Sequence, residues 1–153
     1  MDQQHPSPSR WAIVLAGGEG TRMQPLVHRW LGFNRPKQYC AFVGSRSMFQ
    51  HTVDRAALVT APERIVAVVG RDHRDEILTQ LQGRTIGQVI YQPRNCETAA
   101  GLFLPLTYIH ALAPDATVTF LSGDDVPAAV AAARSADLAI VFATQWTTEA
   151  QDV

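Results

Sequence analysis

Residues 11–22 read WAIVLAGGEGTR, a short apolar run that leads directly into a glycine-rich loop. The run over residues 11–15 is typical of a buried strand, because it is continuously apolar and stops at glycines. Three of the four residues 17–20 are glycine, which allows positive φ angles and a close approach of the backbone to a ligand. Backbone N–H groups exposed in such a loop can bind an anion, so the stretch predicts an anion site after the first strand.

The residues after the glycines favour a phosphate site over a plain turn. Arg22 supplies a planar, fork-shaped cation suited to phosphate. A Walker A loop is excluded, because it needs Gly-Lys-Ser/Thr, and the dinucleotide fingerprint needs a glycine where Met23 stands. A tight strand-to-helix turn without a ligand is the remaining alternative, and Thr21-Arg22 followed by Pro25-Leu26 makes it the weaker one.

The rest of the chain alternates strand and helix patterns. Strands are expected at 64–69, 88–91, 117–121 and 138–143, and helices at 47–59 with Ser47 as N-cap, 73–81, 98–112 and 127–135. Pro105 should kink the helix at 98–112 or mark its boundary. Near-continuous apolar strands between helices indicate an α/β fold, a Rossmann-like three-layer sandwich with a mostly parallel sheet. Ligands in such folds bind at the edge where loops follow the strands.

Composition narrows the class of protein. The chain has 153 residues, 46% hydrophobic and 18% charged, with a formal net charge of -1. This balance gives no electrostatic case for a nucleic-acid or membrane partner, and no apolar run reaches the roughly 18 residues of a membrane span. Residues 1–10 are expected to be a disordered leader. Cys40 and Cys96 are too few for a disulfide framework, which favours a reduced, cytoplasmic setting.

Lys37 is the single lysine beside twelve arginines. Its occurrence has two explanations: a coding bias that favours arginine, or a position that requires a compact ammonium group rather than a guanidinium. The residues around Lys37 favour the second. The stretch 15–26 (LAGGEGTRMQPL) resembles the signature loop of sugar-phosphate nucleotidyltransferases. The stretches 35–39 (RPKQY) and 92–98 (QPRNCET) resemble the second and third elements of the mannose-1-phosphate guanylyltransferase branch of that family. The resemblance covers about residues 11–121.

The resemblance implies a reaction and a set of roles. In this family a sugar 1-phosphate oxygen attacks the α-phosphate of a nucleoside triphosphate, pyrophosphate leaves and a nucleotide sugar forms. By resemblance, Arg22 and Lys37 are the expected catalytic residues: Arg22 stabilises charge on the leaving pyrophosphate and Lys37 approaches the phosphates. The nucleotide, GTP or another triphosphate, is expected to lie on a loop made of Leu15, Ala16, Gly17, Gly18, Glu19, Gly20 and Thr21.

Two further parts of the site are implied with open alternatives. Gln92, Asn95 and Thr98 stand where the family builds part of the nucleobase pocket, although Asn95 and Thr98 could equally cap the following helix. Asp124 takes the place of the family's metal-binding aspartate, but its usual proline, serine and histidine neighbours are replaced. Its carboxylate could hold Mg²⁺, or it could cap a helix that begins near Pro127.

The last part of the chain departs from this pattern. Residues 123–153 resemble a helix and strand from the C-terminal domain of family 3 glycoside hydrolases, without any catalytic residue of those enzymes. We therefore expect a join near Leu121, with residues 11–121 as the nucleotide-binding half of a truncated nucleotidyltransferase domain and 122–153 as an extension that completes it. A sugar 1-phosphate partner is then doubtful, and a free sheet edge could drive homo-oligomer formation.

Three hypotheses follow. The chain is a mannose-1-phosphate guanylyltransferase with weak or no turnover, a non-catalytic nucleotide-binding module, or a chimeric α/β fold that retains no ligand. The sequence favours the first two, because residues 11–121 contain the complete glycine loop and the motifs that follow it.

Overall fold

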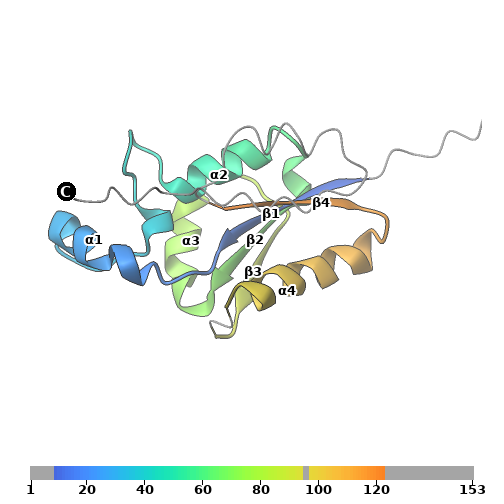
Figure 1. Cartoon of the computed structure of the whole chain (residues 1–153). Coiled ribbons are helices and arrows are strands. Elements are labelled where there is room, and N and C mark those ends of the chain that lie inside the picture. The colour runs from blue at the N-terminus through green and yellow to red at the C-terminus, as the bar shows by residue number, and fades with distance from the viewer. Residues whose placement is uncertain (1–8, 95–96, 123–153) are drawn as a thin grey trace, which may run out of the picture.

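The computed structural model describes residues 9–94 and 97–122 of the chain. Strands alternate with helices along this part, as Figure 1 shows. The strands are β1 (Arg10–Ala16), β2 (Ile65–Gly70), β3 (Gln88–Gln92) and β4 (Thr117–Leu121). The α-helices are α1 (Gln24–Leu31), α2 (Met48–Ala56), α3 (Arg74–Gln80) and α4 (Glu97–Leu112). Single 3₁₀ turns are η1 (Thr21–Met23), η2 (Lys37–Tyr39), η3 (Pro62–Arg64) and η4 (Arg71–His73).

The described strands form one sheet in the order β3-β2-β1-β4, and every neighbouring pair is parallel. Val14 in β1 lies opposite Ala67 of β2 on one side and Leu121 of β4 on the other. The glycine loop therefore leaves the sheet beside the carboxyl ends of both neighbours. The predicted parallel α/β fold is confirmed.

Helices cover both faces of the sheet, with α2 and α4 on opposite sides in Figure 1. Successive strand residues point to opposite faces, so each face has its own core. Phe49 of α2 and Ile77 of α3 pack with Val14 and its neighbours, whereas Ile109 of α4 packs with Ile13 and its neighbours. The inner strands β1 and β2 are buried between these layers, which explains why their sequences are continuously apolar rather than alternating.

The predicted elements match the observed ones, with adjusted ends. The strand patterns agree within one or two residues, and Ser47 is the N-cap of α2, as predicted. That helix ends earlier than expected, at Ala56. Pro105 was expected to kink the helix or mark its boundary; the boundary alternative is wrong, because α4 continues through it. The helix and strand expected at 127–135 and 138–143 lie outside the described residues.

One helix was not predicted. The sequence interpretation assigned no more than a helical turn after the glycine loop, but α1 extends over eight residues. Its signals were Pro25 in the first turn and Gly32 at the C-cap, where φ is 80°. Proline at the start and a left-handed glycine at the end are the usual boundaries of a helix.

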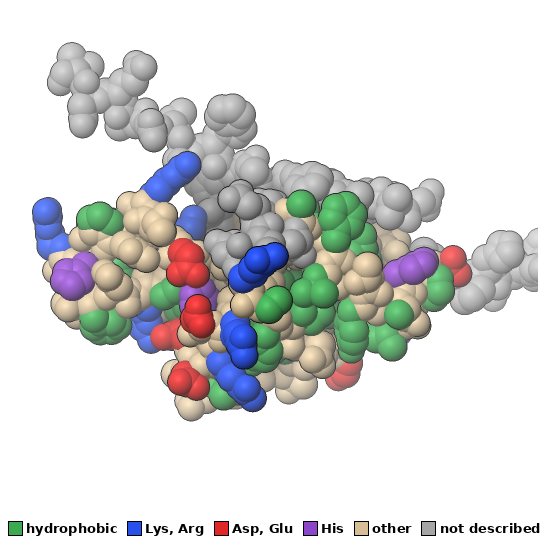
Figure 2. Space-filling view, turned by 90° about the horizontal axis from the view of Figure 1, so that it is seen from below, with side chains coloured by type: hydrophobic (Ala, Val, Ile, Leu, Met, Phe, Trp, Pro, Cys, Tyr) green, Lys and Arg blue, Asp and Glu red, His purple; other side chains and the backbone are tan. Residues whose placement is uncertain are grey.

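Apolar side chains are not confined to the core. They gather over α4 in Figure 2, where Phe103 and Leu112 are 64% and 58% exposed. Charged side chains of both signs lie next to this area in the same view. Within the described part, no helix combines the length and the apolar character that crossing a membrane would require.

Candidate functional site

The glycine loop continues from the carboxyl end of β1, the middle strand flanked by β2 and β4. Gly20 has φ 63° and ψ 30°, a left-handed conformation that favours glycine, and it precedes η1. Arg22 lies in that turn with an exposed side chain. The loop thus takes a left-handed conformation at Gly20, and Arg22 lies at the surface two residues later.

The carbonyl oxygens of the loop are held by η2. The Gln38 side-chain amide donates from Nε2 to the carbonyl oxygens of Ala16 at 2.9 Å and Gly18 at 2.8 Å. The Tyr39 hydroxyl also donates to the Ala16 carbonyl, at 3.4 Å. Gln38 is only 7% exposed, so these bonds are shielded from water. One side of the loop is therefore fixed by hydrogen bonds that span about twenty residues of sequence.

The N–H groups of the loop, unlike its carbonyl groups, form no hydrogen bonds with described residues. Among the residues that the structure describes, the backbone N–H groups of residues 17–21 donate no hydrogen bond to another residue. A methyl group added at Gly18 would meet no atom within 4 Å, so this side of the loop is open. Backbone N–H groups need an acceptor, and no described residue supplies one, so these groups are available to water or a ligand. The loop therefore combines engaged carbonyls with available donors.

Lys37 lies against the loop. A Cβ atom at Gly20 would lie 3.1 Å from the Lys37 backbone nitrogen and 3.4 Å from its Cγ atom. Lys37 is half-buried and begins η2, directly before the glutamine that holds the loop. The chain's single lysine and its glycine loop, predicted to act together, are thus in contact through the lysine stem.

Gln92, at the end of β3, packs between the loop and α4. Its Oε1 atom is 2.5 Å from the position that a Gly17 Cβ would take, and its Nε2 atom is 3.1 Å from that of Gly101. The side chain is 5% exposed. In the described part of the chain its amide makes no hydrogen bond. A nearly buried amide that makes no hydrogen bond to any described residue is therefore present at the rear of the loop.

The other predicted site residues are placed as follows. Leu15 is half-buried and packs with the core under α4, and Ala16 is buried. Glu19 and Thr21 are exposed, and the Glu19 carbonyl accepts from Gln24 Nε2 at 3.4 Å. Asn95, Asp124 and the side chain of Thr98 lie outside the described residues.

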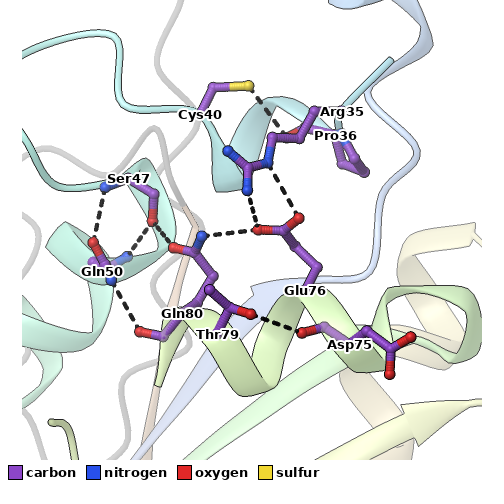
Figure 3. Close-up of polar contacts among 9 residues, drawn as sticks. All are labelled: Arg35, Pro36, Cys40, Ser47, Gln50, Asp75, Glu76, Thr79 and Gln80. Carbon is purple, nitrogen blue, oxygen red and sulfur yellow. Dashed lines mark hydrogen bonds and ion pairs between the residues drawn. The ribbon is translucent and has the colours of Figure 1, made fainter. Parts of the chain in front are cut away.

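A network of polar side chains supports η2 from below, as Figure 3 shows. Arg35 donates from Nε and Nη2 to the two carboxylate oxygens of Glu76, at 3.1 and 2.8 Å. Gln80 Nε2 donates to the same carboxylate at 2.9 Å, and Ser47 donates its hydroxyl to Gln80 Oε1. This network was missed by the sequence interpretation, because its partners are up to 41 residues apart.

Burial raises the pKa of two neighbouring side chains, Tyr39 in η2 and Cys40 directly after it. Burial raises the pKa of the Tyr39 hydroxyl well above its usual range, and the Glu76 carboxylate raises it further. Burial also raises the pKa of the Cys40 thiol, although the Arg35 guanidinium opposes this effect. Both groups therefore stay protonated at neutral pH, and Cys40 is a buried free thiol that packs as a small apolar side chain.

The described residues offer no ready metal site. They contain no cluster of three or more histidine, cysteine, aspartate or glutamate side chains that could hold an ion. Mg²⁺ requires oxygen ligands, and Glu19 is the acidic residue of the loop itself. A magnesium assignment thus rests on Asp124.

Comparison with known proteins identifies the family. The family model described as nucleotidyl transferase matches residues 11–151. The chain belongs to the nucleotidyl transferase family. The match extends through residues 123–151, so it gives no support to a separate, glycoside hydrolase-like origin of that segment, and the predicted join stays a prediction.

Relatives of this nucleotidyl transferase include a protein named as a mannose-1-phosphate guanylyltransferase and one named as a xanthan biosynthesis protein. It is 30% identical over 116 residues to a mannose-1-phosphate guanylyltransferase of Salmonella montevideo, covering 74% of this chain and 23% of the relative. It is 37% identical over 92 residues to the xanthan biosynthesis protein XanB of Xanthomonas campestris, covering 59% of this chain and 19% of the relative. The chain thus spans about a fifth of the length of these curated relatives.

Solved structures agree on the fold. A Thermus thermophilus protein titled mannose-1-phosphate geranyltransferase superposes with a TM-score of 0.60 at 25% identity, covering 79% of this chain and 35% of that one. The inositol-1-phosphate CTP transferase of T. maritima superposes with a TM-score of 0.59 at 24% identity, covering 84% and 49%. The nucleotidyl transferase fold of the described part is therefore established independently of its motifs.

Proposed function

We propose that the chain binds GTP with Mg²⁺ and that its site is of the mannose-1-phosphate guanylyltransferase type. The reaction would join GTP and mannose 1-phosphate to give GDP-mannose and pyrophosphate. The observation that carries the proposal is the loop after β1: Gln38 holds the carbonyls of Ala16 and Gly18, while the N–H groups of residues 17–21 donate no hydrogen bond among the described residues. Support comes from relatives named for this activity.

The triphosphate would lie on the open side of the loop. Backbone N–H groups and a nearby ammonium group together offset phosphate charge without needing to reorganise, which is how phosphoryl-transfer sites mainly act. Lys37 approaches from η2 and Arg22 from η1, so two cations of different shape flank the loop. In this proposal Lys37 holds the bound phosphates and Arg22 stabilises charge that develops on the leaving pyrophosphate.

The nucleobase would lie toward β3. An amide can donate and accept at once, which suits the edge of a purine. Gln92 carries such an amide, nearly buried beside Gly17 and without a hydrogen bond among the described residues. Asn95 and Thr98 follow it in sequence and are proposed to complete this side. The choice of GTP over other triphosphates rests on the relatives.

Asp124 is the proposed ligand of Mg²⁺, which would neutralise triphosphate charge and orient the phosphates. We further propose the predicted division of the chain, with residues 11–121 as the nucleotide-binding half and 122–153 as its extension. Turnover by the 153-residue chain alone is expected to be weak or absent, because it spans 23% of the length of the guanylyltransferase relative.

Isothermal titration of the full chain with GTP and Mg²⁺ tests the proposal. We expect saturable binding in the original chain and at least roughly tenfold weaker binding in Lys37→Ala and Arg22→Ala, because each loses a charge-assisted contact. Arg64→Ala is the matched control. Arg64 is an exposed arginine in η3, before the amino end of β2 and hence at the opposite edge of the sheet.

The outcomes separate the hypotheses. Binding that is lost in Lys37→Ala and kept in Arg64→Ala supports the proposed site. Absence of heat with the original chain would leave the fold without a retained ligand. Binding without pyrophosphate release on addition of mannose 1-phosphate indicates a non-catalytic module, whereas release that depends on mannose 1-phosphate shows that catalysis is present.

A further inference from the structure

Arg35 and Lys37 flank Pro36, and the two residues contact different parts of the molecule: Arg35 contacts α3, and Lys37 contacts the glycine loop. Arg35 forms a two-bond ion pair with Glu76, in which the side chains are 29% and 23% exposed. A guanidinium that is paired through both Nε and Nη2 is fixed in position as well as in charge. Arg35 is thus held by Glu76, whereas Lys37, on the other side of Pro36, lies against the glycine loop.

Glu76 is itself held by two helices. It belongs to α3, and Gln80, one turn later in that helix, donates to its Oε1 atom at 2.9 Å. Gln80 accepts from the Ser47 hydroxyl, and its backbone carbonyl accepts from Gln50 Nε2 at 3.0 Å. Ser47 and Gln50 form the capping box of α2. The carboxylate that holds Arg35 is therefore anchored to α2 and α3 together, as seen in Figure 3.

The backbone between Arg35 and Lys37 transmits this position with little freedom. Pro36 has φ -58° and ψ 137°, with φ fixed by its ring. Its carbonyl accepts from the Tyr39 N–H at 3.0 Å, and the Lys37 carbonyl accepts from the Cys40 N–H at 3.0 Å. A shift of Arg35 would thus move the turn that carries Lys37.

We propose that Glu76 is a positioning residue for nucleotide binding, acting through Arg35 to place the Lys37 side chain at the phosphates. The inference rests on the proposed function. Glu76 neutralises Arg35 and fixes the residue on one side of Pro36, so that the cation on the other side meets the ligand in one geometry. The role belongs to the ion pair and not to the carboxylate alone.

A double-mutant cycle tests this role. Affinities for GTP with Mg²⁺ and for guanosine are measured by titration of the full chain for Glu76→Gln, Arg35→Lys, Lys37→Ala and the pair Glu76→Gln/Lys37→Ala. We expect Glu76→Gln and Arg35→Lys to weaken GTP binding roughly tenfold, because a small displacement of a contacting group has effects of this size or larger. Guanosine binding should not change, since it lacks the phosphates.

The cycle has a decisive arm. In the Lys37→Ala background, Glu76→Gln should cause no further loss of GTP affinity, because the side chain that it positions is gone. Asp54→Asn is the control: Asp54, in α2, forms a two-bond pair with Arg84 at 3.1 and 3.3 Å and also accepts from Arg46 Nη1 at 2.9 Å, so the variant weakens ion pairs that do not involve Arg35. This variant should bind GTP like the original chain.

Each result bears on a different claim. Thermal unfolding identifies the temperature at which all variants are folded, and Arg35→Lys replaces Glu76→Gln in the cycle should the latter not fold. GTP affinity unchanged in both variants, or an equal loss with and without Lys37, overturns the positioning role alone. No GTP binding by the original chain overturns the proposed function, and this inference with it.

Discussion

At Gly17 the loop depends on the absence of a side chain. A Cβ atom there would lie 2.5 Å from Gln92 Oε1, and Gly101 confines the other end of the same amide. Gln92 is nearly buried, so it cannot simply swing into water. The φ angle is not the restriction at Gly17, because the positive values belong to other glycines of the described chain. The close approach of Gln92 is what requires glycine here.

Gly17→Ala should therefore lower the free energy of unfolding by about 1–3 kcal/mol, the usual range for overpacking. Gly18→Ala is the control, since its methyl group would meet no atom within 4 Å and should change stability by less than about 0.5 kcal/mol. Urea unfolding measures both. In the double variant Gly17→Ala/Gln92→Ser, the shorter side chain at position 92 should recover part of the lost stability. Equal stabilities of Gly17→Ala and Gly18→Ala would contradict the explanation.

Sequence patterns found the loop but not its supports. Glycine spacing and the following Arg22 predicted an anion site because those features are local. The bonds from Gln38 to two loop carbonyls join residues about twenty positions apart, and no periodicity encodes them. The stretch 35–39 was recognised as a motif, yet its glutamine was assigned no role. Long-range hydrogen bonds of this kind become visible only in three dimensions.

At the scale of elements, the start of α2 joins helix stability to the loop. The Ser47 hydroxyl accepts from the Gln50 N–H at 3.1 Å, and the Ser47 N–H donates to Gln50 Oε1 at 3.1 Å. Ser47 is also buried against Gln80, which reaches Glu76. The cap is thus shared between a helix terminus and the network under η2.

Ser47→Ala should destabilise the fold by about 1–2 kcal/mol, because it removes the cap and leaves Gln80 Oε1 without its donor. Ser45→Ala is the control, as Ser45 is exposed two residues earlier. Thermal unfolding of the two variants gives the comparison. A loss no larger for Ser47 than for Ser45 would show that the capping box contributes nothing.

Elements were predictable where one face or both are buried. Each apolar residue from Ile65 to Val69 in β2 is buried, and the pattern alone located this strand. Helix α1 was missed because it is only eight residues long and Val27 is its one buried residue, although Leu26, Val27, Trp30 and Leu31 recur at helical spacing. Pro105 was expected to kink or bound α4; it does not bound the helix, which continues to Leu112 and buries Ile109 in the core.

For the whole molecule, Tyr39 links stability to alkaline pH. It is 1% exposed, and burial followed by Glu76 raises the pKa of its hydroxyl in the folded chain. The unfolded chain then loses this proton first, near the ordinary value of 10.0. Stability is complete below that pH and falls as pH rises above it, by roughly 1.4 kcal/mol per pH unit.

Tyr39→Phe should remove this contribution. Its free energy of unfolding should depend less on pH between about 9 and 11 than that of the original chain, because the Tyr39 hydroxyl no longer ionises. Tyr91 and Tyr108 are present in both chains, so the difference between the two slopes reports on Tyr39. Urea unfolding across this range measures the two slopes. Parallel slopes would mean that the Tyr39 hydroxyl ionises equally in the folded and unfolded chains.

The position of β1 in the sheet also governs how the molecule is made. Arg10 pairs with Thr117 and Ala16 with Val69, so both neighbours of the middle strand come much later in the chain. At ordinary translation rates the ribosome needs roughly 5–20 s to reach β4 after β1 has been synthesised. During that time an apolar strand with open edges is available to chaperones and to other nascent chains, and folding must wait for its most distant contact.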